Sequence, residues 1–528
     1  MIDHGEVTTL QRRLKRAWGP FFTRFGRLTP VQIETIPKIL DGANVVVASP
    51  TASGKTEAVV APVAERFISQ GAEGLAILYI VPTRALANDT LERITGPLED
   101  MGITTALKHG DRPTLSLTAL PNCLITTPES LDSLICRRSQ ALRALQTVIL
   151  DEIHLLDNTY RGDQLRLLLW RLRKLVCDES FSVHLLSATL FAPDEVARRY
   201  CGPCSYEVVS VAGARDIDYW FVDSYENAYR LVREHNWRKV LAFCNLRESV
   251  EMVASALAPL WHPYPVVAHH GNLSRRVREE SETVMKEAEV AVCVATSTLE
   301  IGIDIGDIDL ILLAEVPWSL SALLQRIGRG NRRAGRIHAA TIATTSEEKS
   351  VLETMLRIAD CGTLPDEPYT PDLSVAVQQT FSHLYQYPEG TPEPELLELL
   401  SPLCSKRESR GILEQLRQRE WVRWRAGRWL ASRKLMNLGA KGRVHSNIPD
   451  SQTYTVIDIG SGQEVGTLSG VFDDLFVLGQ RAWRIVSQEG KIIKASRFGG
   501  RATAPAFQRH KDAGAFFGML PANLKGNR

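Results

Sequence analysis

Short apolar runs recur along residues 1–360 and alternate with longer stretches in which apolar residues return every three or four positions. The short runs predict buried strands and the periodic stretches predict helices, an alternation typical of βαβ units and a parallel sheet. Residues 1–210 form the first predicted domain, with strands at Val45–Ala48, Leu75–Val81, Cys123–Thr126, Thr147–Leu150 and Val183–Leu186.

The same alternation starts again after a predicted linker at Ser210–Asp218. Residues 211–360 therefore predict a second parallel-sheet domain. Its expected strands are Val240–Cys244, Pro265–His269, Val290–Ala295, Leu310–Ala314 and Ala340–Thr344.

The pattern changes in the C-terminal part. Residues 361–442 contain three helical patterns followed by two short strands around Ala426 and Gly427, which predicts a winged-helix domain. Residues 443–528 contain short alternating strands separated by glycine turns, as in a small β-barrel-like domain. The expected fold is α/β, with two tandem parallel-sheet domains followed by these two smaller domains.

Charge is segregated along the chain, although the net charge is only +1. Residues 401–445 contain 12 Lys and Arg against 3 Glu, and residues 479–528 contain 10 against 2 acidic residues. These segments carry +9 and +8, which leaves −16 for the rest of the chain. A basic C-terminal portion predicts a polyanionic partner, although solvated charged faces remain the alternative.

The remaining composition predicts a cytoplasmic protein that binds no membrane. The hydrophobic fraction of 44% is ordinary for a globular protein of several domains. No apolar run approaches the roughly 18 residues of a membrane span, and the N-terminus lacks the features of a signal peptide.

The stretch Val45–Glu57 passes from an apolar run through a loop of small residues into a helix. The N–H groups of such a loop bind phosphate, so we expect Lys55 to reach the β- and γ-phosphates and Thr56 to hold Mg²⁺. Ser49 stands where the usual G-x-x-x-x-G-K-[ST] pattern has its first glycine, and an ordinary strand-to-helix turn remains open. The predicted cofactor-binding residues of this loop are Thr51, Ser53, Gly54, Lys55 and Thr56.

Gln32 lies 23 residues before Lys55. Its amide can pair with the adenine edge, donating to N7 and accepting from the N6 amino group, which would select ATP. A surface glutamine at a helix start is the other interpretation.

Two carboxylates, Asp151 and Glu152, follow the strand Thr147–Leu150. Carboxylates at the carboxyl end of a buried strand are costly unless they meet cations, and an open α/β sheet binds its ligand at this edge. We expect Asp151 to hold Mg²⁺ through water and Glu152 to orient and deprotonate the attacking water. The hydroxyls of Ser187–Thr189, after the next strand, can bond to these carboxylates.

Polar residues also follow two other strands of the first domain. Their hydroxyls, arginine and helix-start amides can hold a sugar-phosphate backbone while leaving the bases largely unread, although ordinary helix caps are the alternative. The residues are Pro82, Thr83, Arg84, Thr127 and Pro128.

The second domain has no phosphate loop of its own but contains the arginine-rich stretch Gln325–Arg333. Arginine keeps its charge and binds phosphate oxygens in a forked geometry, so Arg329 and Arg332 can neutralise a transition state across a cleft. A solvated helix is the alternative for this stretch alone.

Taken together, these motifs resemble the ordered motifs of superfamily-two helicases. In that family, paired RecA-like domains close on ATP at their interface and move along one nucleic acid strand. The resemblance assigns Gly302 and Asp304 to the cofactor, and Gln325, Arg329 and Arg332 to catalysis beside Lys55 and Glu152. Asn331 stands where a glycine is common in the last motif. The resemblance also implies nucleic-acid contacts at Asn245, His270, Gly271, Thr296 and Thr298.

Three stretches resemble the large-helicase-related (Lhr) group of this superfamily: Pro50–Glu57, Thr296–Gly306 and Pro317–Arg326. In the C-terminal part, Leu478–Ile485 resembles a segment in which a tryptophan stacks on a nucleobase. Trp483 is the candidate for that role here, and burial in the core is the alternative.

The resemblance implies an ATP-driven motor that uses Mg²⁺, moves 3′ to 5′ on single-stranded DNA and unwinds duplexes. The expected partners are single-stranded and tailed duplex DNA, or a DNA–RNA hybrid. An RNA helicase is one alternative, and an ATPase clamp that does not separate strands is another.

Overall fold

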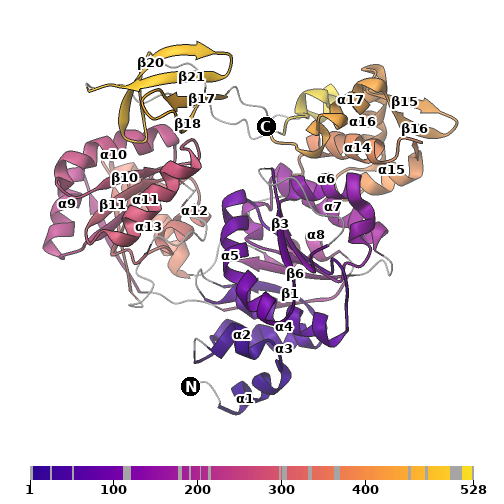
Figure 1. Cartoon of the computed structure of the whole chain (residues 1–528), viewed down its shortest axis with the longest axis horizontal. Coiled ribbons are helices and arrows are strands. Elements are labelled where there is room, and N and C mark those ends of the chain that lie inside the picture. Colours follow the sequence, from indigo (N-terminus) through magenta and orange to yellow (C-terminus); the bar gives the residue numbers. More distant parts are fainter. Residues whose placement is uncertain are drawn as a thin grey trace. The chain divides into compact units, whose positions relative to one another are not determined.

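The computed structural model describes residues 4–23, 26–49, 53–110, 120–176, 181–188, 192–202, 204–211, 216–296, 299, 306–330, 336–361, 369–449, 453–469, 474–499 and 514–525. The chain forms two compact units. The first unit combines residues 1–212 with 366–450 and 511–528, and the second combines 213–365 with 451–510. Each unit therefore joins one α/β domain to residues from the C-terminal part, two segments in the first unit and one in the second (Figure 1).

A seven-stranded parallel sheet forms the centre of the first unit, in the order β3-β4-β2-β5-β6-β1-β7. The inner strands β2, β4 and β5 are buried at every position, which explains why they appear in the sequence as continuous apolar runs. The strands are β1 (Asn44–Ala48), β2 (Ile77–Ile80), β3 (Thr105–Lys108), β4 (Cys123–Thr126), β5 (Thr147–Leu150), β6 (Ser182–Ser187) and β7 (Tyr206–Ser210). The helices are α1 (His4–Arg13), α2 (Trp18–Phe22), α3 (Pro30–Leu40), α4 (Lys55–Ser69), α5 (Arg84–Asp100), α6 (Pro128–Arg138), α7 (Tyr160–Leu175) and α8 (Pro193–Cys201).

A six-stranded parallel sheet forms the centre of the second unit, in the order β10-β11-β9-β12-β13-β8. The prediction of two parallel sheets is confirmed. The strands are β8 (Asp216–Val222), β9 (Lys239–Phe243), β10 (Val266–His269), β11 (Ala291–Ala295), β12 (Leu310–Leu313) and β13 (Arg336–Ile342). The helices are α9 (Tyr225–Glu234), α10 (Arg247–Trp261), α11 (Arg275–Glu287), α12 (Leu320–Ile327) and α13 (Ser346–Cys361).

The linker predicted at Ser210–Asp218 is wrong at both ends. β7 continues to Ser210 and pairs with β1, while β8 begins at Asp216 and pairs with β13. β8 mixes acidic and aromatic residues, so it shows neither an apolar run nor a clean alternation, and its strand structure depends on pairing with β13.

The C-terminal segment of the first unit is helical, with a small three-stranded sheet in the order β14-β16-β15. α14 is buried all round because helices of the first α/β domain pack on one side and the remaining C-terminal helices pack on the other. The elements are α14 (Ser374–Gln386), β14 (Thr391–Pro392), α15 (Glu393–Leu400), α16 (Lys406–Gln418), β15 (Val422–Arg425), β16 (Arg428–Ala431), α17 (Arg433–Ala440) and the short 3₁₀ helix η5 (Arg443–His445).

The C-terminal segment of the second unit is a five-stranded sheet in the order β18-β17-β21-β20-β19. Its core is continuous with that of the α/β domain, because Val456, Phe476 and Trp483 belong to the same hydrophobic cluster as Leu257 and Trp261 of α10. The strands are β17 (Thr453–Asp458), β18 (Glu464–Ser469), β19 (Leu475–Leu478), β20 (Arg481–Glu489) and β21 (Ile492–Arg497).

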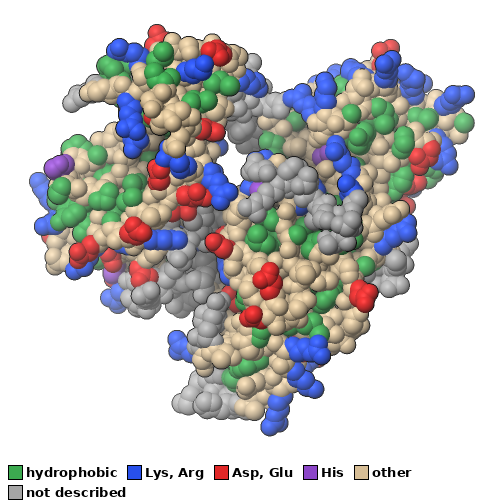
Figure 2. Space-filling view, in the orientation of Figure 1, with side chains coloured by type: hydrophobic (Ala, Val, Ile, Leu, Met, Phe, Trp, Pro, Cys, Tyr) green, Lys and Arg blue, Asp and Glu red, His purple; other side chains and the backbone are tan. Residues whose placement is uncertain are grey.

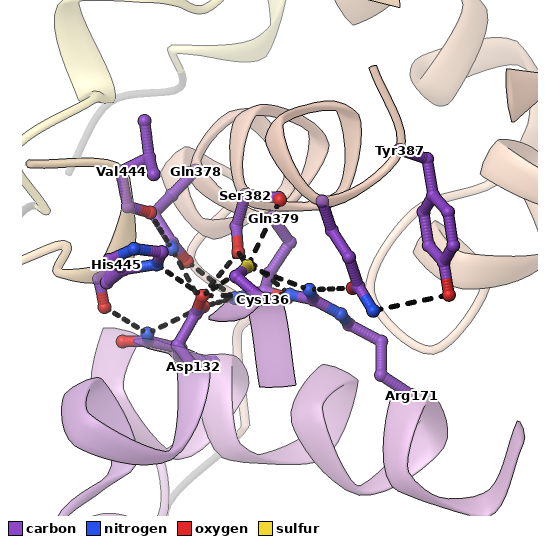
Figure 3. Close-up of polar contacts among 11 residues, drawn as sticks. Asp132, Cys136, Arg171, Gln378, Gln379, Ser382, Tyr387, Val444 and His445 are labelled. Atoms are coloured by element: carbon purple, nitrogen blue, oxygen red, sulfur yellow. Dashed lines mark hydrogen bonds and ion pairs between the residues drawn. The ribbon is translucent and has the colours of Figure 1, made fainter. Parts of the chain in front are cut away.

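A buried carboxylate, Asp132 on α6, joins the helical segment to the first α/β domain (Figure 3). Its Oδ1 accepts a hydrogen bond from His445 Nδ1 at 3.0 Å, and Arg171 Nη1 lies 3.7 Å from the same oxygen. Its Oδ2 accepts hydrogen bonds from the side-chain amides of Gln164 and Gln378 at 3.3 and 3.1 Å. The carboxylate therefore connects α6 and α7 with α14 and η5.

Both ionisable groups of this pair have shifted pKa values. Burial alone would raise the pKa of Asp132, but the hydrogen bond from His445 and the charge of Arg171 lower it to about 2. Burial alone would lower the pKa of His445, but its hydrogen bonds with Asp132 and Cys136 raise it to about 9. The Asp132 contribution to stability is present above about pH 4 and is lost as pH falls through 2. The His445 contribution is present below about pH 6.5 and is lost as pH rises through 9.

We predict that Asp132→Asn lowers the free energy of unfolding by about 3–5 kcal/mol at pH 7, because it leaves the Arg171 guanidinium buried without its carboxylate and removes the interaction that stabilises protonated His445. Thermal and urea unfolding at pH 7 and at pH 10 measure the effect. It should be smaller at pH 10, where His445 is neutral in both proteins.

Glu398→Gln is the matched control, because Glu398 and Lys174 form an exposed ion pair with N–O distance 3.3 Å. Exposed pairs contribute about 0–1 kcal/mol, so this variant should unfold almost as the unmodified protein does. Equal losses in the two variants would contradict the role of Asp132.

Candidate functional site

The loop after β1 leads into α4 through Gly54, whose φ of +86° lies in the left-handed region. Lys55 Nζ donates a 2.6 Å hydrogen bond to the carbonyl oxygen of Ser49, so the side chain folds back over the loop. The hydroxyl oxygens of Ser49 and Ser53 are buried and lack a hydrogen-bond partner among the described residues. Buried donors at a helix N-terminus suit the oxygens of a phosphate group.

Gln32 lies against this loop and is only 4% exposed. Its Nε2 donates to the Gly54 carbonyl oxygen at 3.3 Å, and its Oε1 accepts from the Thr29 backbone N–H at 2.9 Å. The φ of +86° favours glycine at residue 54, and a Cβ there would lie 2.4 Å from Gln32 Nε2, so the Gln32 side chain would have to move. Gln32 thus supports the loop, while its contact with adenine stays a prediction.

Asp151 and Glu152 follow β5 at the carboxyl edge of the same sheet. Burial and the charge of Glu152 raise the pKa of Asp151 to about 6, against the opposing effect of a hydrogen bond from Tyr79. Glu152 has φ +46°, an uncommon conformation for a residue with a side chain, and strain of this kind is typical of functional sites. Two crowded carboxylates beside an anion-binding loop suit a divalent cation.

His154 links this acidic pair to the next strand. Its Nδ1 lies 2.8 Å from Ser187 Oγ and 3.4 Å from Glu152 Oε2. The Ser187 backbone carbonyl in turn accepts from the Ser49 N–H at 3.1 Å, which ties the strand to the phosphate loop. The ends of β1, β5 and β6 are therefore joined by side-chain and backbone hydrogen bonds.

Two residues of the site, Tyr79 and Arg93, are not found by the sequence reasoning. Tyr79 OH donates to Asp151 Oδ2 at 2.7 Å, and Arg93 Nη1 donates to Thr56 Oγ1 at 3.2 Å. Arg93 also forms an ion pair with Asp89 at 2.8 Å. The only sequence signal was a hydroxyl-bearing aromatic within the buried run of β2, which a strand pattern alone does not connect with a carboxylate.

The residues predicted to hold a nucleic acid backbone lie at the ends of β2 and β4, which are neighbours in the sheet. Thr83 caps α5, because its Oγ1 accepts from the Leu86 N–H at 3.2 Å. Thr127 is the N-cap of α6 without a side-chain hydrogen bond, and Pro128 occupies the first helical position. Thr83 therefore acts as a helix cap, and the nucleic-acid contacts of all five residues stay predictions.

In the second unit, Asn245 follows β9 and is held by three hydrogen bonds. Its N–H donates to Glu315 Oε2 at 2.7 Å, its Nδ2 donates to the Val316 carbonyl at 2.8 Å, and its Oδ1 accepts from Arg326 at 3.0 Å. Gln325 and Arg326 are neighbours on α12, and Arg329 lies two residues after the end of this helix. Gln325 and Arg329 are buried, with Arg329 only 3% exposed.

Two nucleic-acid candidates are buried: the contact of His270 stays a prediction, and the stacking role of Trp483 is corrected. His270 is fully buried, and its Nε2 lies 2.9 Å from Glu251 Oε1. Trp483 is 1% exposed and donates through Nε1 to the Leu478 carbonyl at 2.8 Å, so it is a core residue and not a stacking platform. Gly271 is exposed and Thr296 is buried.

Glu251 explains why His270 is buried. Its two carboxylate oxygens also accept from the backbone N–H groups of Gly479 and Gln480, at 2.7 and 2.9 Å. The pair therefore attaches the β19–β20 turn to α10.

Six predicted residues lie outside the described part of the chain: Thr51, Thr189, Thr298, Gly302, Asp304 and Arg332.

Among the described residues, one group of mixed ligand type could hold a metal ion: Asp132, Cys136 and His445, whose ligand atoms lie within 4.8 Å of one another. Arg171 Nη2 donates to Cys136 Sγ at 3.3 Å, so a guanidinium already supplies positive charge there.

No helix in the described part of the chain has the length and apolarity needed to cross a membrane.

Two protein-family models match this chain. The family described as DEAD/DEAH box helicase matches residues 29–196, which include the phosphate loop and the acidic pair. The family described as helicase conserved C-terminal domain matches residues 223–334, which include α12.

Named relatives agree with these matches. An ATP-dependent helicase Lhr-Core protein 2 from Thermococcus barophilus is 34% identical over 388 residues, which cover 65% of this chain and 44% of the relative. The ATP-dependent helicase Lhr-Core of Methanocaldococcus jannaschii is 29% identical over 570 residues, which cover 95% of this chain and 65% of the relative. The chain is similar to ATP-dependent helicases of the Lhr type. It spans less than two thirds of the length of either relative.

Solved structures show the same architecture. The Mycobacterium smegmatis helicase Lhr, bound to ssDNA and AMP-PNP, has a TM-score of 0.71 and 26% identity, and the match covers 82% of this chain and 62% of the solved one. The helicase MrfA bound to DNA has a TM-score of 0.73 at 19% identity, which shows the shared fold alone.

We predict that Asp151→Asn raises the melting temperature of the nucleotide-free protein at pH 7.5. A carboxyl whose pKa is raised from 3.8 to about 6 makes the folded state less stable as pH rises through 6, and asparagine removes that cost. The gain, followed by thermal unfolding, should shrink as pH falls from 6 towards 4, because Asp151 is then protonated in the folded state and increasingly protonated in the unfolded state. Asp41→Asn, at an exposed ion pair with Arg13, is the control and should change little; a destabilised Asp151→Asn would contradict the prediction.

Proposed function

We propose that this protein is an ATP-driven motor that moves on single-stranded DNA, 3′ to 5′, and unwinds duplexes. The observation that supports it most directly is the meeting of Lys55 and Thr56 with Asp151 and Glu152 at one edge of a parallel sheet. Phosphate donors and paired carboxylates at this edge suit a nucleoside triphosphate with its divalent cation.

In this proposal ATP and Mg²⁺ occupy the first α/β domain. The buried loop hydroxyls of Ser49 and Ser53 and the Lys55 ammonium suit the phosphates, and Thr56 and Asp151 suit the cation. Mg²⁺ would supply Lewis-acid neutralisation of the phosphate oxygens. Glu152 orients the attacking water and accepts its proton, with His154 and Ser187 fixing its position.

The catalytic residues proposed in the second α/β domain are Gln325, Arg329 and Arg332. Arg329 lies two residues after the end of α12, and Arg326 on that helix donates a hydrogen bond to Asn245. An arginine that stabilises the transition state accelerates phosphoryl transfer by about 10³ to 10⁵-fold.

We also infer that the C-terminal segments are a winged-helix domain and a β-barrel-like domain. The order α14-β14-α15-α16-β15-β16, with β16 between β14 and β15, supports the winged-helix assignment. The mixed sheet β17–β21, with antiparallel pairs and one parallel pair, supports the second assignment less specifically. The domain limits 1–210, 211–360, 361–442 and 443–528 remain part of the proposal.

DNA is the proposed nucleic acid because the M. smegmatis Lhr structure contains ssDNA. Contacts with a backbone do not by themselves distinguish the sugars, so an RNA helicase remains the second candidate. A clamp that hydrolyses ATP without separating strands is the third.

Lys55→Ala should abolish ATP hydrolysis because the β- and γ-phosphates lose their ammonium partner, while the melting temperature stays within about 2 °C. A DNA-stimulated phosphate-release assay measures the activity. Lys38→Ala, at an exposed pair with Glu207, is the control and should retain full activity. Retained turnover in Lys55→Ala would overturn the assignment of the loop.

Arg329→Ala should reduce hydrolysis by about 10³-fold or more and leave nucleotide affinity nearly unchanged, because the guanidinium acts in the transition state. Binding of a fluorescent ATP analogue and single-turnover hydrolysis separate the two quantities. Arg276→Ala, at an exposed pair with Glu280, is the control. Equal losses of binding and hydrolysis would count against the finger role.

The choice between the three functions is tested by strand displacement from duplexes with 3′ tails, 5′ tails or blunt ends, made of DNA, RNA or a hybrid. We expect ATP-dependent displacement only from substrates whose 3′ tail is DNA. Displacement from 5′ tails would overturn the polarity, RNA dependence would favour the second candidate, and hydrolysis without displacement would favour the clamp.

A further inference from the structure

The β15–β16 hairpin presents a face of three arginines. In the antiparallel register Trp424 lies opposite Trp429, while Arg425 lies opposite Arg428 and Arg423 opposite Leu430. Because side chains alternate across a strand, Arg423, Arg425 and Arg428 point to one face of the small sheet. All three are exposed, whereas Val422 and Trp429 on the opposite face are buried in the core.

This arginine face is poorly neutralised within the chain. Arg425 and Arg428 are directly opposed across the hairpin, an arrangement in which like charges destabilise a sheet. Arg428 Nη1 donates to the Gly390 carbonyl at 2.9 Å, while Arg423 and Arg425 form no ion pair with any residue that the structure describes. Lys and Arg side chains are frequent over this C-terminal helical segment in Figure 2. An external anion would relieve the repulsion.

The side chains of the arginine face favour binding to the phosphodiester groups of a nucleic acid duplex. All three cations are arginines, whose planar guanidinium binds phosphate oxygens with two parallel hydrogen bonds. Single-strand sites combine charge with aromatic platforms, but Trp424, which is 44% exposed, lies on the opposite face with Trp429 at a ring distance of 4.9 Å. A face of arginines without an aromatic suits backbone contact, and duplex DNA presents phosphates most densely, about one per 1.7 Å of axis.

The arginine face is also held rigidly. Ala426 and Gly427 both have positive φ, of +49° and +75°, which matches the tight two-residue turn that keeps hairpin strands in register. β16 pairs with β14, and Trp429 packs in the cluster that contains α14 residues. α14 is tied to the first α/β domain through Asp132, so the hairpin position is fixed relative to that domain.

We propose that the arginine face of the β15–β16 hairpin docks on the phosphate backbone of duplex nucleic acid and positions it on the first unit. The proposal rests on the motor function proposed above and adds the part of the substrate that this surface takes. It assigns no base recognition to the hairpin, because contacts with phosphate carry no sequence information.

The test is the salt dependence of binding by the full chain with Arg423→Ala and Arg425→Ala combined. Fluorescence anisotropy is measured with a tailed DNA duplex and with the matching single strand. Each lost phosphate contact should reduce the slope of log K against log salt by about 0.9, so the variant should lose about 2 units on the duplex substrate. On the single strand the slope and the stimulated ATPase rate should stay unchanged.

Two comparisons make the result specific. Arg230→Ala with Arg233→Ala removes the same charge from exposed positions on α9 and should leave both slopes unchanged. Arg423→Lys with Arg425→Lys should restore the duplex slope with lower affinity, because lysine keeps the charge without the forked geometry. Arg428 is left intact since it also holds Gly390.

An unchanged duplex slope in the alanine variant, or an equal loss on duplex and single strand, would overturn the docking role. If the unmodified protein shows no nucleic-acid-stimulated ATPase, the motor function fails and this proposal fails with it. If stimulated hydrolysis is present but the duplex slope is insensitive to Arg423 and Arg425, only the docking proposal fails, and an acidic protein becomes the better-matched occupant.

Discussion

Parallel pairing of β1, β5 and β6 is the constraint on which the site depends. The strands are short and far apart in sequence, but parallel alignment brings all their carboxyl ends to one edge. Lys55 and Asp151 follow β1 and β5, and Ser187 ends β6, so a single sheet register determines which groups meet. A slip of register by one residue would reverse the faces of a buried strand and separate the groups.

This edge combines groups that oppose one another in the absence of ligand. Asp151 and Glu152 repel each other, and burial keeps the pKa of Asp151 near 6. Tyr79, Arg93 and Lys55 offset part of that cost through hydrogen bonds and charge. The buried hydroxyls of Ser49 and Ser53 and the left-handed backbone of Glu152 also lower the stability of the ligand-free protein. A charged ligand bound at this edge would offset these costs.

The sequence predicts the two parallel sheets and the strand-end motifs well, because each depends on local composition and on the rule that parallel strands share an edge. It misses Tyr79 and Arg93, since their partners Asp151 and Thr56 lie on other elements. It leaves Trp483 open between core and surface, because a tryptophan in an alternating strand suits either. His270 follows a glycine-flanked strand end typical of a ligand site, but its buried partner Glu251 lies on α10, 19 residues earlier.

The same kind of long-range contact explains why the linear domain order and the compact units differ. The helical segment shares a buried polar hub with α6 and α7, and the five-stranded segment shares a hydrophobic core and the Glu251 carboxylate with α10. A buried hub whose carboxylate accepts from several elements has a well-defined geometry, because each displaced partner would leave a polar group unsatisfied. Each α/β domain therefore has its own C-terminal segment as a fixed attachment, and a displacement of either α/β domain would carry the attached surface with it, including the arginine face on β15 and β16.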